Sequence, residues 1–408
     1  MGKPKIRFKG YEDDWEQRKF SEFVKNVAVR NREGLELECY AVTNDRGFIS
    51  QKDAHDDFGY MVDVDTTAYN IVPPNSFAYN PARINVGSIG YYAGTENVIV
   101  SSLYEVFQTA DYVDDRFLWH WFKSEHFSKW IERLQEGSVR LYFYYDKLIQ
   151  CEIKMPSLEE QMKIGAYFNH LDHLITLHQR KCEETKSLKK YMLQKMFPEN
   201  GKCVPEIRFS GFSDDWEQRK LSEIAIEKLS NGIMNNQAND ETGLRHINVI
   251  NMYDPDKIHP EKLTFSNYDE DAVKKCNVEW GDIFLTRSSL KPEGIAESNV
   301  LLDSGRFVYD DHLIRLKLDK EKYDPFFVKL NLSGSIFKRQ FIARAKTTAF
   351  TTIGQEDIAE CFGLFPEKEE QEKIGTYFSN LDHLITLHQH KCDELQKLKK
   401  FMLQNMFM

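Results

Sequence analysis

The stretch that decides the fold reads EEQMKIGAYFNHLDHLITLHQRKCEETKSLKKYMLQKMF at residues 159–197. It returns as EEQEKIGTYFSNLDHLITLHQHKCDELQKLKKFMLQNMF at residues 369–407, with 28 of 39 positions identical. In both copies apolar residues recur at heptad spacing, and neither Pro nor Gly interrupts the pattern after Gly165 or Gly375. The pattern predicts two helices, each about 40 residues and roughly 60 Å long.

The predicted seam of each helix mixes apolar with polar residues. The a positions of the first copy are Phe168, Ile175, Cys182, Lys189 and Met196. A seam of this kind is typical of two helices packed on one another, in which polar side chains fix the register. Further apolar residues flank the seam and would be covered by a docked partner helix. These candidate docking residues are Tyr167, Leu174, Leu177 and Leu188, with Tyr377, Leu384, Leu387 and Leu398 in the second copy.

A second repeated segment opens each half of the chain. Residues 4–23 (PKIRFKGYEDDWEQRKFSEF) match residues 205–224 (PEIRFSGFSDDWEQRKLSEI) at 14 of 20 positions. The segments between the two repeats differ in sequence, and a linker with helix breakers, Pro198-Glu199-Asn200-Gly201, joins the halves. The chain is therefore two copies of one unit, in which one part is kept and another varied. The predicted boundaries are 1–158, 159–200, 201–368 and 369–408.

The two varied domains are predicted to be mixed α+β. Residues 97–107 and 305–318 have the apolar alternation of strands. One helix is predicted in each domain, at 114–135 and at 324–345, beginning behind the capping residues Asp114 or Asp115 and Asp324.

The loops of the varied domains place amide, hydroxyl and aromatic side chains beside basic ones. Such side chains reach base edges and phosphates of nucleic acid, although any one of them also suits an ordinary polar loop. The candidate DNA contacts are Asn80, Arg83, Arg140 and Tyr142 in the first domain, and Thr286, Arg287, Ser288, Lys346 and Thr347 in the second.

Composition and missing motifs argue against several classes of protein. The net charge of −10 is unusual for a free-standing nucleic-acid binder. No apolar run approaches the roughly 18 residues that span a bilayer, so we expect a cytoplasmic protein. Seven cysteines without a Cys-x-x-Cys pair disfavour a zinc ribbon. His170, His173 and His178 suggest metal ligands, but the second copy replaces His170 with Asn380, and we expect no metal site.

No catalytic motif stands out in the sequence. Pro73-Pro74 lacks the preceding Asn or Asp and the following aromatic residue of an amino-methyltransferase loop. There is no Gly-x-Gly turn and no phosphate-cradling Gly-Lys-Ser/Thr motif. Asp146, Glu152 and Lys154 resemble a nuclease set, but the second copy has Phe362 and Leu364 in place of Glu152 and Lys154. We therefore expect no catalytic residues in this chain.

The repeated motifs resemble the specificity subunits of type I restriction–modification enzymes. The resemblance rests on the Trp-Glu-Gln-Arg-Lys-x-Ser-Glu opening of each half and on the segments 77–83 and 281–287. The Pro…Glu-Gln-x-Lys-Ile start of each long helix, at Pro156 and Pro366, is the most specific feature. The resemblance covers essentially the whole chain, twice and in the same order.

The resemblance implies two target-recognition domains, each reading one half of a split, asymmetric DNA sequence. It implies that the long helices pair as an antiparallel coiled coil and act as a ruler, whose roughly 60 Å span about 17 base pairs. It further implies two methyltransferase subunits docked on the helices and two restriction subunits in the full complex. S-adenosylmethionine, ATP and Mg would then belong to those partners, and this chain would bind no cofactor.

Three other roles remain open at this point. The chain could be a scaffold that docks methyltransferases without reading DNA, or an enzyme fused to its own recognition domain. It could also be a coiled-coil interaction module unrelated to DNA. The last reading explains the helices but leaves the two diverged domains without a purpose.

Overall fold

A computed structural model describes residues 2–44, 47–54, 65–137, 141–199, 201–238, 241 and 243–408. The chain forms two compact units. Unit 1 comprises residues 1–178 and 390–408, and unit 2 comprises residues 179–389. Each unit therefore contains one varied domain and a part of both long helices. Within the described residues, no helix is long and apolar enough to cross a membrane.

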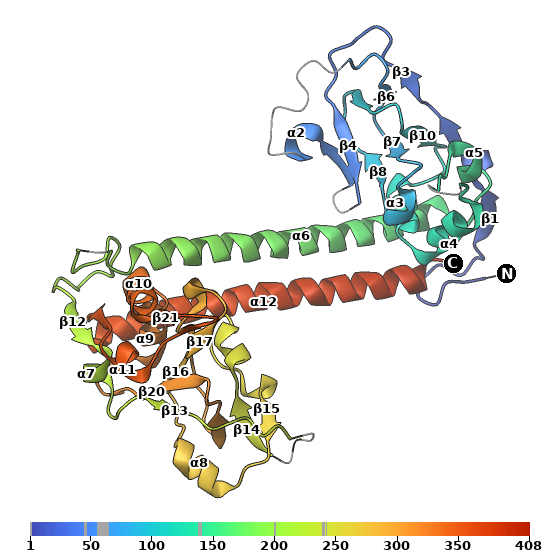
Figure 1. Cartoon of the computed structure of the whole chain (residues 1–408). Coiled ribbons are helices and arrows are strands. Elements are labelled where there is room, and N and C mark those ends of the chain that lie inside the picture. The colour runs from blue at the N-terminus through green and yellow to red at the C-terminus, as the bar shows by residue number, and fades with distance from the viewer. Residues whose placement is uncertain are drawn as a thin grey trace. The chain divides into compact units, whose positions relative to one another are not determined.

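Unit 1 is built around a four-stranded antiparallel sheet in the order β2-β10-β7-β8. Three smaller sheets, β1-β11, β3-β6-β9 and β4-β5, complete it (Figure 1). The strands are β1 (Glu16–Lys19), β2 (Val24–Asn26), β3 (Val29–Arg30), β4 (Tyr40–Thr43), β5 (Gly47–Ser50), β6 (Asn70–Val72), β7 (Ser76–Tyr79), β8 (Ile89–Tyr92), β9 (Val98–Val100), β10 (Glu105–Thr109) and β11 (Glu152–Met155). The helices are α1 (Phe20–Phe23), α2 (Gln51–Ala54), α3 (Asp115–Phe122), α4 (Glu125–Leu134) and α5 (Tyr145–Leu148), with a 3-10 turn η2 (Ile84–Val86).

Unit 2 repeats the central sheet as β13-β20-β16-β18 and the small sheet as β12-β23, which confirms two copies of one fold. Its other sheets are β15-β14-β19 and β17-β22-β21. The strands are β12 (Glu217–Lys220), β13 (Ser230–Asn231), β14 (Leu244–Ile247), β15 (Thr264–Ser266), β16 (Ile283–Thr286), β17 (Ser288–Ser289), β18 (Ser298–Val300), β19 (Phe307–Tyr309), β20 (Leu313–Leu316), β21 (Lys346–Thr347), β22 (Thr351–Thr352) and β23 (Phe362–Phe365). The helices are α7 (Leu221–Ile224), α8 (Glu270–Cys276), α9 (Pro325–Leu332), α10 (Ser335–Arg344) and α11 (Gln355–Ala359), with 3-10 turns η3 (Val249–Tyr253), η4 (Pro260–Lys262) and η5 (Pro292–Gly294).

The single helix predicted in each varied domain is wrong, because each is broken into two. Ser124 adopts an extended backbone between α3 and α4, and its hydroxyl donates to Trp121 O over 2.7 Å. Gly334 is extended in the same way between α9 and α10. The predicted starts hold, since the Asp114 carboxylate accepts from Phe117 N and Asp324 accepts from Phe327 N.

The two long strand predictions are likewise too long. Residues 97–107 contain the whole of β9 and the start of β10, because a turn at 101–104 separates the two strands. The two strands belong to different sheets. The run 305–318 divides between β19 and β20 for the same reason. The apolar residues on both sides of each turn were read as one strand, although Ser101-Ser102 and Asp310-Asp311 interrupt them.

The long helices α6 (Leu158–Lys195) and α12 (Lys368–Met406) pair antiparallel within each unit (Figure 1). In unit 1 the Phe168 and Phe407 rings lie 5.7 Å apart, and Lys399 pairs with Asp172. In unit 2 the Lys189 ammonium lies 2.5 Å from the Asp382 carboxylate, one of several polar contacts inside the seam. The pairing expected from the repeats is confirmed.

The kept opening segment clamps the start of each long helix. Arg7 donates two hydrogen bonds of 2.8 Å to the fully buried Glu160 carboxylate. Arg208 makes the same bidentate pair with Glu370, at 2.7 Å. A planar guanidinium matches a carboxylate in this geometry, so both copies keep the two residue types.

The Glu-Gln-x-Lys-Ile-Gly motif joins the long helix to the start of α3. The Gln161 side chain accepts from Asp114 N at 3.0 Å and donates to Pro156 O at 3.0 Å, which ties the long helix to the cap of α3. A Cβ on Gly165 would meet Asp114 Oδ1 at 2.6 Å, so only glycine allows this approach. Gly375 stands in the same relation to Asp324, at 2.7 Å.

We expect reversal of the Lys189 charge to destabilise unit 2. The Asp382 side chain is only 8% exposed, and burial raises the pKa of its carboxyl while Lys189 opposes that shift. Lys189→Asp leaves two buried carboxylates facing each other and should cost about 3 kcal/mol or more of unfolding free energy. Asp382→Lys in the same chain should restore most of the loss. Urea denaturation measures both.

Glu183→Ala is the matched control, because Glu183 forms an exposed pair with Lys186 on the same helix. It should change the unfolding free energy by about 0.5 kcal/mol or less. If Lys189→Asp were equally mild, or if the double variant were no better than the single one, this ion pair would not set the register.

Candidate nucleic-acid interface

A pocket of about 800 Å³ in unit 1 gathers three of the residues singled out from the sequence. Asn80, Arg83 and Tyr142 all line it, although 62 positions of chain separate Asn80 from Tyr142. The pocket lies where β7 ends and the 142–144 segment passes alongside, since Phe143 N donates to Pro81 O over 3.0 Å. Arg140 lies outside the described residues.

The backbone around this pocket holds its polar side chains in place. The Asn80 side-chain oxygen accepts from Ala82 N at 3.0 Å, which fixes the orientation of the amide. Arg83 is exposed and belongs to the turn that Asn80 begins. The Tyr142 and Tyr144 rings stack with centroids 5.4 Å apart and planes 2° from parallel. Together they present hydrogen-bonding groups, a cation and aromatic faces to one cavity.

Sequence reasoning missed several residues of the same pocket, among them Asn26, Arg30, Asn70 and Tyr144. Tyr144 carried a usable signal, because residues two apart in an extended segment share a face. Asn26, Arg30 and Asn70 lie on β2, β3 and β6, and nothing in their local sequence links them to Asn80 or Tyr142. Glu105 is the acidic member, and burial raises the pKa of its carboxyl above the ordinary value.

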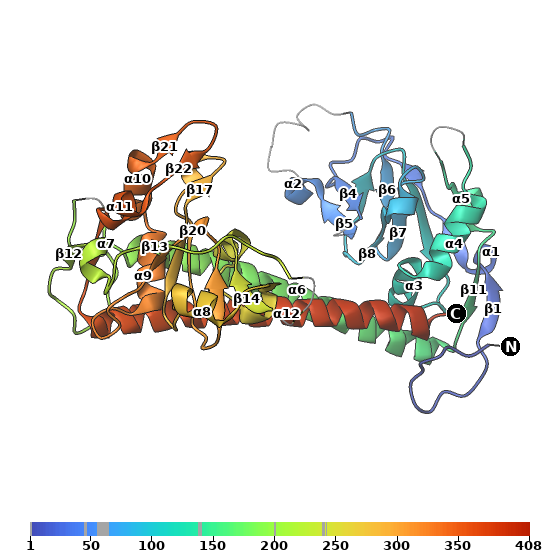
Figure 2. The same ribbon diagram turned by 60° about the horizontal axis from the view of Figure 1, so that its bottom comes forward.

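The candidate residues of unit 2 come together on the small sheet β17-β22-β21 (Figure 2). Ser288 pairs with Thr352, which pairs in turn with Lys346. Arg287 precedes β17, and its backbone is held on both sides, by His312 O at 2.9 Å and by Ile353 N at 3.0 Å. Arg287, Lys346 and Thr347 are exposed on this sheet.

The prediction that Thr286 contacts DNA is wrong. Thr286 ends β16, is fully buried, and its hydroxyl accepts from Glu297 N at 2.9 Å. Its side chain therefore holds the base of the loop and does not face a ligand. The sequence placed the whole 286–289 run in a loop, whereas Thr286 ends β16 and Ser288–Ser289 form β17.

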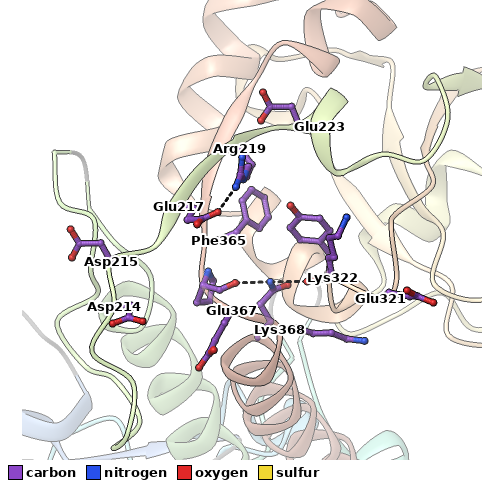
Figure 3. Close-up of a pocket in the computed structure, with 13 residues that line it drawn as sticks. Asp214, Asp215, Glu217, Arg219, Glu223, Glu321, Lys322, Phe365, Glu367 and Lys368 are labelled. Carbon is purple, nitrogen blue, oxygen red and sulfur yellow. Dashed lines mark hydrogen bonds and ion pairs between the residues drawn. The ribbon is translucent and has the colours of Figure 1, made fainter.

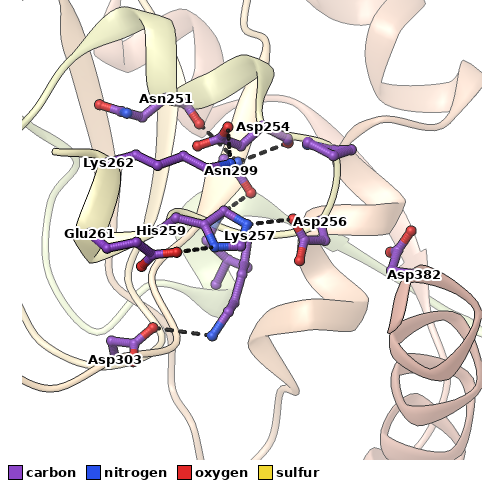
Figure 4. A network of polar contacts seen from close by, with 12 residues as sticks. Asn251, Asp254, Asp256, Lys257, His259, Glu261, Lys262, Asn299, Asp303 and Asp382 are labelled. Carbon is purple, nitrogen blue, oxygen red and sulfur yellow. Dashed lines mark hydrogen bonds and ion pairs between the residues drawn. The ribbon is translucent and has the colours of Figure 1, made fainter. Parts of the chain in front are cut away.

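A pocket of about 550 Å³ adjoins the small sheet of unit 2. Ser288, Lys291 and Phe350 line one side, and Tyr253 of η3 lines the other. The segment that carries Tyr253 is held by a polar network in which Asn299 donates to Asn251 O at 2.9 Å and to Asp254 O at 3.1 Å (Figure 4).

The candidate docking residues on the long helices fall into two groups. Tyr167 packs against Phe8 with ring centroids 6.0 Å apart, and Tyr377 packs against Phe209 at 6.1 Å, so part of each tyrosine is covered by its own unit. Leu174 and Leu177 are half-buried. The others remain exposed: Leu188, Leu384, Leu387 and Leu398.

An acidic groove of about 810 Å³ lies at the start of α12 in unit 2 (Figure 3). We use "acidic groove" for the cavity lined by Asp214, Asp215, Glu217, Glu223, Glu321 and Glu367, together with Arg219, Lys322 and Lys368. Asp214, Asp215, Glu217, Arg219 and Glu223 are identical to Asp13, Asp14, Glu16, Arg18 and Glu22 in the first copy. Most of them are exposed, so packing of the core does not require this identity.

Among the described residues, Asp310, Asp311 and His312 form a group with the geometry to hold a metal ion. The His312 ring nitrogen Nδ1 lies 2.9 Å from Asp310 Oδ1 and 3.0 Å from Asp311 Oδ1. Asp310 Oδ1 also accepts from His312 N at 2.8 Å, so local hydrogen bonds account for the arrangement. The absence of a metal site from the chain stays a prediction.

Each unit thus carries cations and hydroxyls on a varied surface, and unit 1 adds amides. Arg and Lys bind phosphates, whereas Asn, Ser and Thr reach base edges in a groove of the duplex. The arrangement suits binding of a nucleic acid by many weak contacts. The contacting side chains of unit 1 differ in chemistry from those of unit 2.

Comparison with known proteins also points to DNA recognition. A family model described as "Type I restriction modification DNA specificity domain" matches residues 12–187 and 213–397. Two similar proteins come from Methanocaldococcus jannaschii. The putative type I restriction enzyme MjaX specificity subunit is 21% identical over 416 residues, and the type I restriction enzyme MjaVIII specificity subunit is 23% identical over 401. Each alignment covers 95% of this chain and 91% of the relative.

A solved structure shares the fold. The crystal structure of the type I restriction–modification system S subunit from M. genitalium aligns with a TM-score of 0.59 at 12% identity. The alignment covers 100% of this chain and 99% of that one. The two-copy architecture is therefore that of a known structure.

We expect Arg83→Ala and Arg287→Ala each to weaken binding of duplex DNA by the assembled complex. If each arginine binds one phosphate, the slope of log binding constant against log salt should fall by about 0.9 per variant. Fluorescence anisotropy over a salt series measures it. Lys274→Ala, an exposed lysine on α8 away from both pockets, should leave the slope unchanged. Unchanged slopes for both arginines would place the phosphate contacts elsewhere.

Proposed function

We propose that this chain, which belongs to the family of type I restriction–modification DNA specificity subunits, reads a split, asymmetric DNA target with one half-site per unit. It is a specificity subunit with two DNA specificity domains. The proposal of a split target rests on the division between kept and varied surfaces.

The observation that carries the proposal is a shared frame with two different polar surfaces. Both units keep the central sheet order, the Arg–Glu clamp and the glycine contact at the start of the long helix. The surface of unit 1 presents Asn80, Arg83 and stacked tyrosines, whereas that of unit 2 presents Arg287, Lys346 and hydroxyl groups. A frame repeated with altered contacts suits two half-sites of different sequence.

We further propose that the kept surfaces dock two methyltransferase subunits, with two restriction subunits in the complete enzyme. The exposed identity between Asp13-Asp14 and Asp214-Asp215 supports this, because one partner met twice needs the same contacts twice. The acidic groove would receive a basic surface of that partner. The exposed leucines of the long helices, Leu188 on α6 and Leu384, Leu387 and Leu398 on α12, would add apolar contacts with the same partner.

The division of chemistry follows from the same proposal. S-adenosylmethionine, ATP and Mg would be bound by the methyltransferase and restriction subunits, and this chain would supply recognition without catalysing a step. Adenine would then be methylated by a partner that this chain positions on its target.

The chain co-expressed with its methyltransferase subunit should methylate one split motif in a host free of methylation. Sequencing that detects N6-methyladenine should show one modified adenine in each half of the motif. Exchange of residues 21–158 for those of another family member should change one half only, because the other half is read by unit 2. The unchanged half of the motif then serves as the internal control.

Absence of new methylation with an intact complex on a sizing column would contradict DNA reading and favour a scaffold. Absence of a complex would contradict the docking proposal. Methylation by the chain alone would overturn its non-catalytic role.

Reversal of the kept acidic pairs should remove the methyltransferase copies one at a time. Asp13→Lys with Asp14→Lys should remove one copy, the same change at Asp214 and Asp215 should remove the other, and all four should remove both. Native mass spectrometry counts the subunits. Asp271→Lys, an exposed carboxylate on α8, is the matched control. Retention of both copies by the quadruple variant would exclude the acidic groove from docking.

A further inference from the structure

The described leucines with the greatest exposure lie on the two candidate DNA surfaces. Leu290 is 82% exposed and Leu103 is 70% exposed, whereas the next, Leu387 on α12, is 51% exposed. Exposing a leucine forfeits the roughly 1.5–3 kcal/mol that its burial contributes, and a turn has no structural need of it. Met234 and Ile250 are similarly exposed, at 73% and 70%, but of these four residues only Leu103 and Leu290 line a candidate DNA pocket together with a cation.

Leu103 stands at the tip of the turn between β9 and β10 in unit 1. Tyr104 N donates to Ser101 O at 3.1 Å, and Asn70 donates to Tyr104 O at 2.8 Å, so the turn is fixed on the side that follows Leu103. Leu103 lines the same pocket as Asn80 and Arg83. An apolar side chain is therefore held among hydrogen-bonding groups and a cation.

Leu290 follows β17 in unit 2 and lines the pocket beside the small sheet. Lys291 N donates to the Ser289 hydroxyl at 3.2 Å, and Gly294 N donates to Lys291 O at 3.1 Å, which shapes the turn. Phe350, 54% exposed on the turn between β21 and β22, lines the same pocket. The apolar group again shares its pocket with a cation, here Lys291.

The repeat indicates which kind of ligand covers these leucines. Both turns belong to the varied domains, where the two copies differ in sequence, and neither leucine lies in a kept segment. A methyltransferase met by both units would require the same contact in both. A ligand that differs between the units, flanked by Arg and Lys, is a DNA half-site.

We infer that Leu103 and Leu290 make apolar contacts with base pairs, each in the half-site read by its own unit. The apolar surfaces that a duplex offers are the thymine methyl in the major groove and the faces of bases at an opened step. The flanking cations bind phosphates and hold the leucine in the groove. This inference rests on the proposed function and adds the residues that discriminate one base pair in each half.

The experiment uses the assembled methyltransferase complex and a set of duplexes with every single base change in its motif. Leu290→Ala should reduce discrimination at a base pair of the half-site read by unit 2 by about tenfold, and leave the other half unchanged. Leu103→Ala should do the reverse. Methionine at either position should stay within about threefold of leucine, whereas asparagine, similar in size but polar, should behave as alanine does. Methylation rates measure each ratio.

Replacement of thymine by uracil identifies the contacted surface. If the contact is a thymine methyl, uracil at that position should lower the wild-type rate and leave the alanine variant unaffected. If it is an opened base step, uracil should have little effect, and 2-aminopurine fluorescence at the step should fall on Leu→Ala substitution. Leu35→Ala and Ile226→Ala, exposed apolar residues outside both pockets, are the controls.

Wild-type discrimination in both alanine variants would overturn the inference and leave the proposed function standing. Loss of a methyltransferase copy in native mass spectrometry would overturn it as well, because the leucines would then contact the partner subunit. Absence of methylation by the wild-type complex would overturn the proposed function, and this inference with it.

Discussion

The rest of the structure depends on the charged pairs inside the helix seam. Lys399 pairs with Asp172 in unit 1, and Lys189 pairs with Asp382 in unit 2. A lysine at an apolar heptad position is costly unless a carboxylate meets it, and only one antiparallel register brings the partners together. Because each unit contains parts of both helices, the pairs also decide which segments share a unit. Phe197 at the end of α6 packs on Phe327 in unit 2 as a result.

The start of each long helix converts this register into a position for the varied domain. Glu160 receives Arg7, Gln161 receives Asp114 N, and Gly165 admits the Asp114 side chain at close range. Glu160 therefore holds the opening segment, Gln161 holds the cap of α3, and Gly165 sets how closely that cap approaches α6. The domain can change its loops freely as long as these contacts persist. This explains how the two copies can differ in the loops that present Asn80 and Arg83 in unit 1 and Arg287 and Lys346 in unit 2.

Sequence alone predicted the elements whose causes are local or repeated. The long helices follow from heptad spacing, and the caps at Asp114 and Asp324 follow from residue type. The break at Ser124 escaped prediction because aromatic residues continue across it, and its cause is a hydrogen bond to Trp121 O. Among site residues, Asn80 and Tyr142 were predicted from their chemistry, but the pocket that joins them depends on how distant strands pack. Thr286 was misplaced because burial at a strand end leaves no local signal.

The net charge of −10 is compatible with DNA binding because the acidic and the basic side chains lie on different surfaces. The kept opening segments carry exposed carboxylates such as Asp13, Asp14, Asp214 and Asp215, whereas Arg83, Arg287 and Lys346 lie on varied segments. A duplex repelled by the first set and held by the second would bind weakly to the chain by itself. Covering the carboxylates with a basic partner removes the repulsion without altering any base contact. Affinity and specificity would then reside in different molecules, with this chain supplying the specificity.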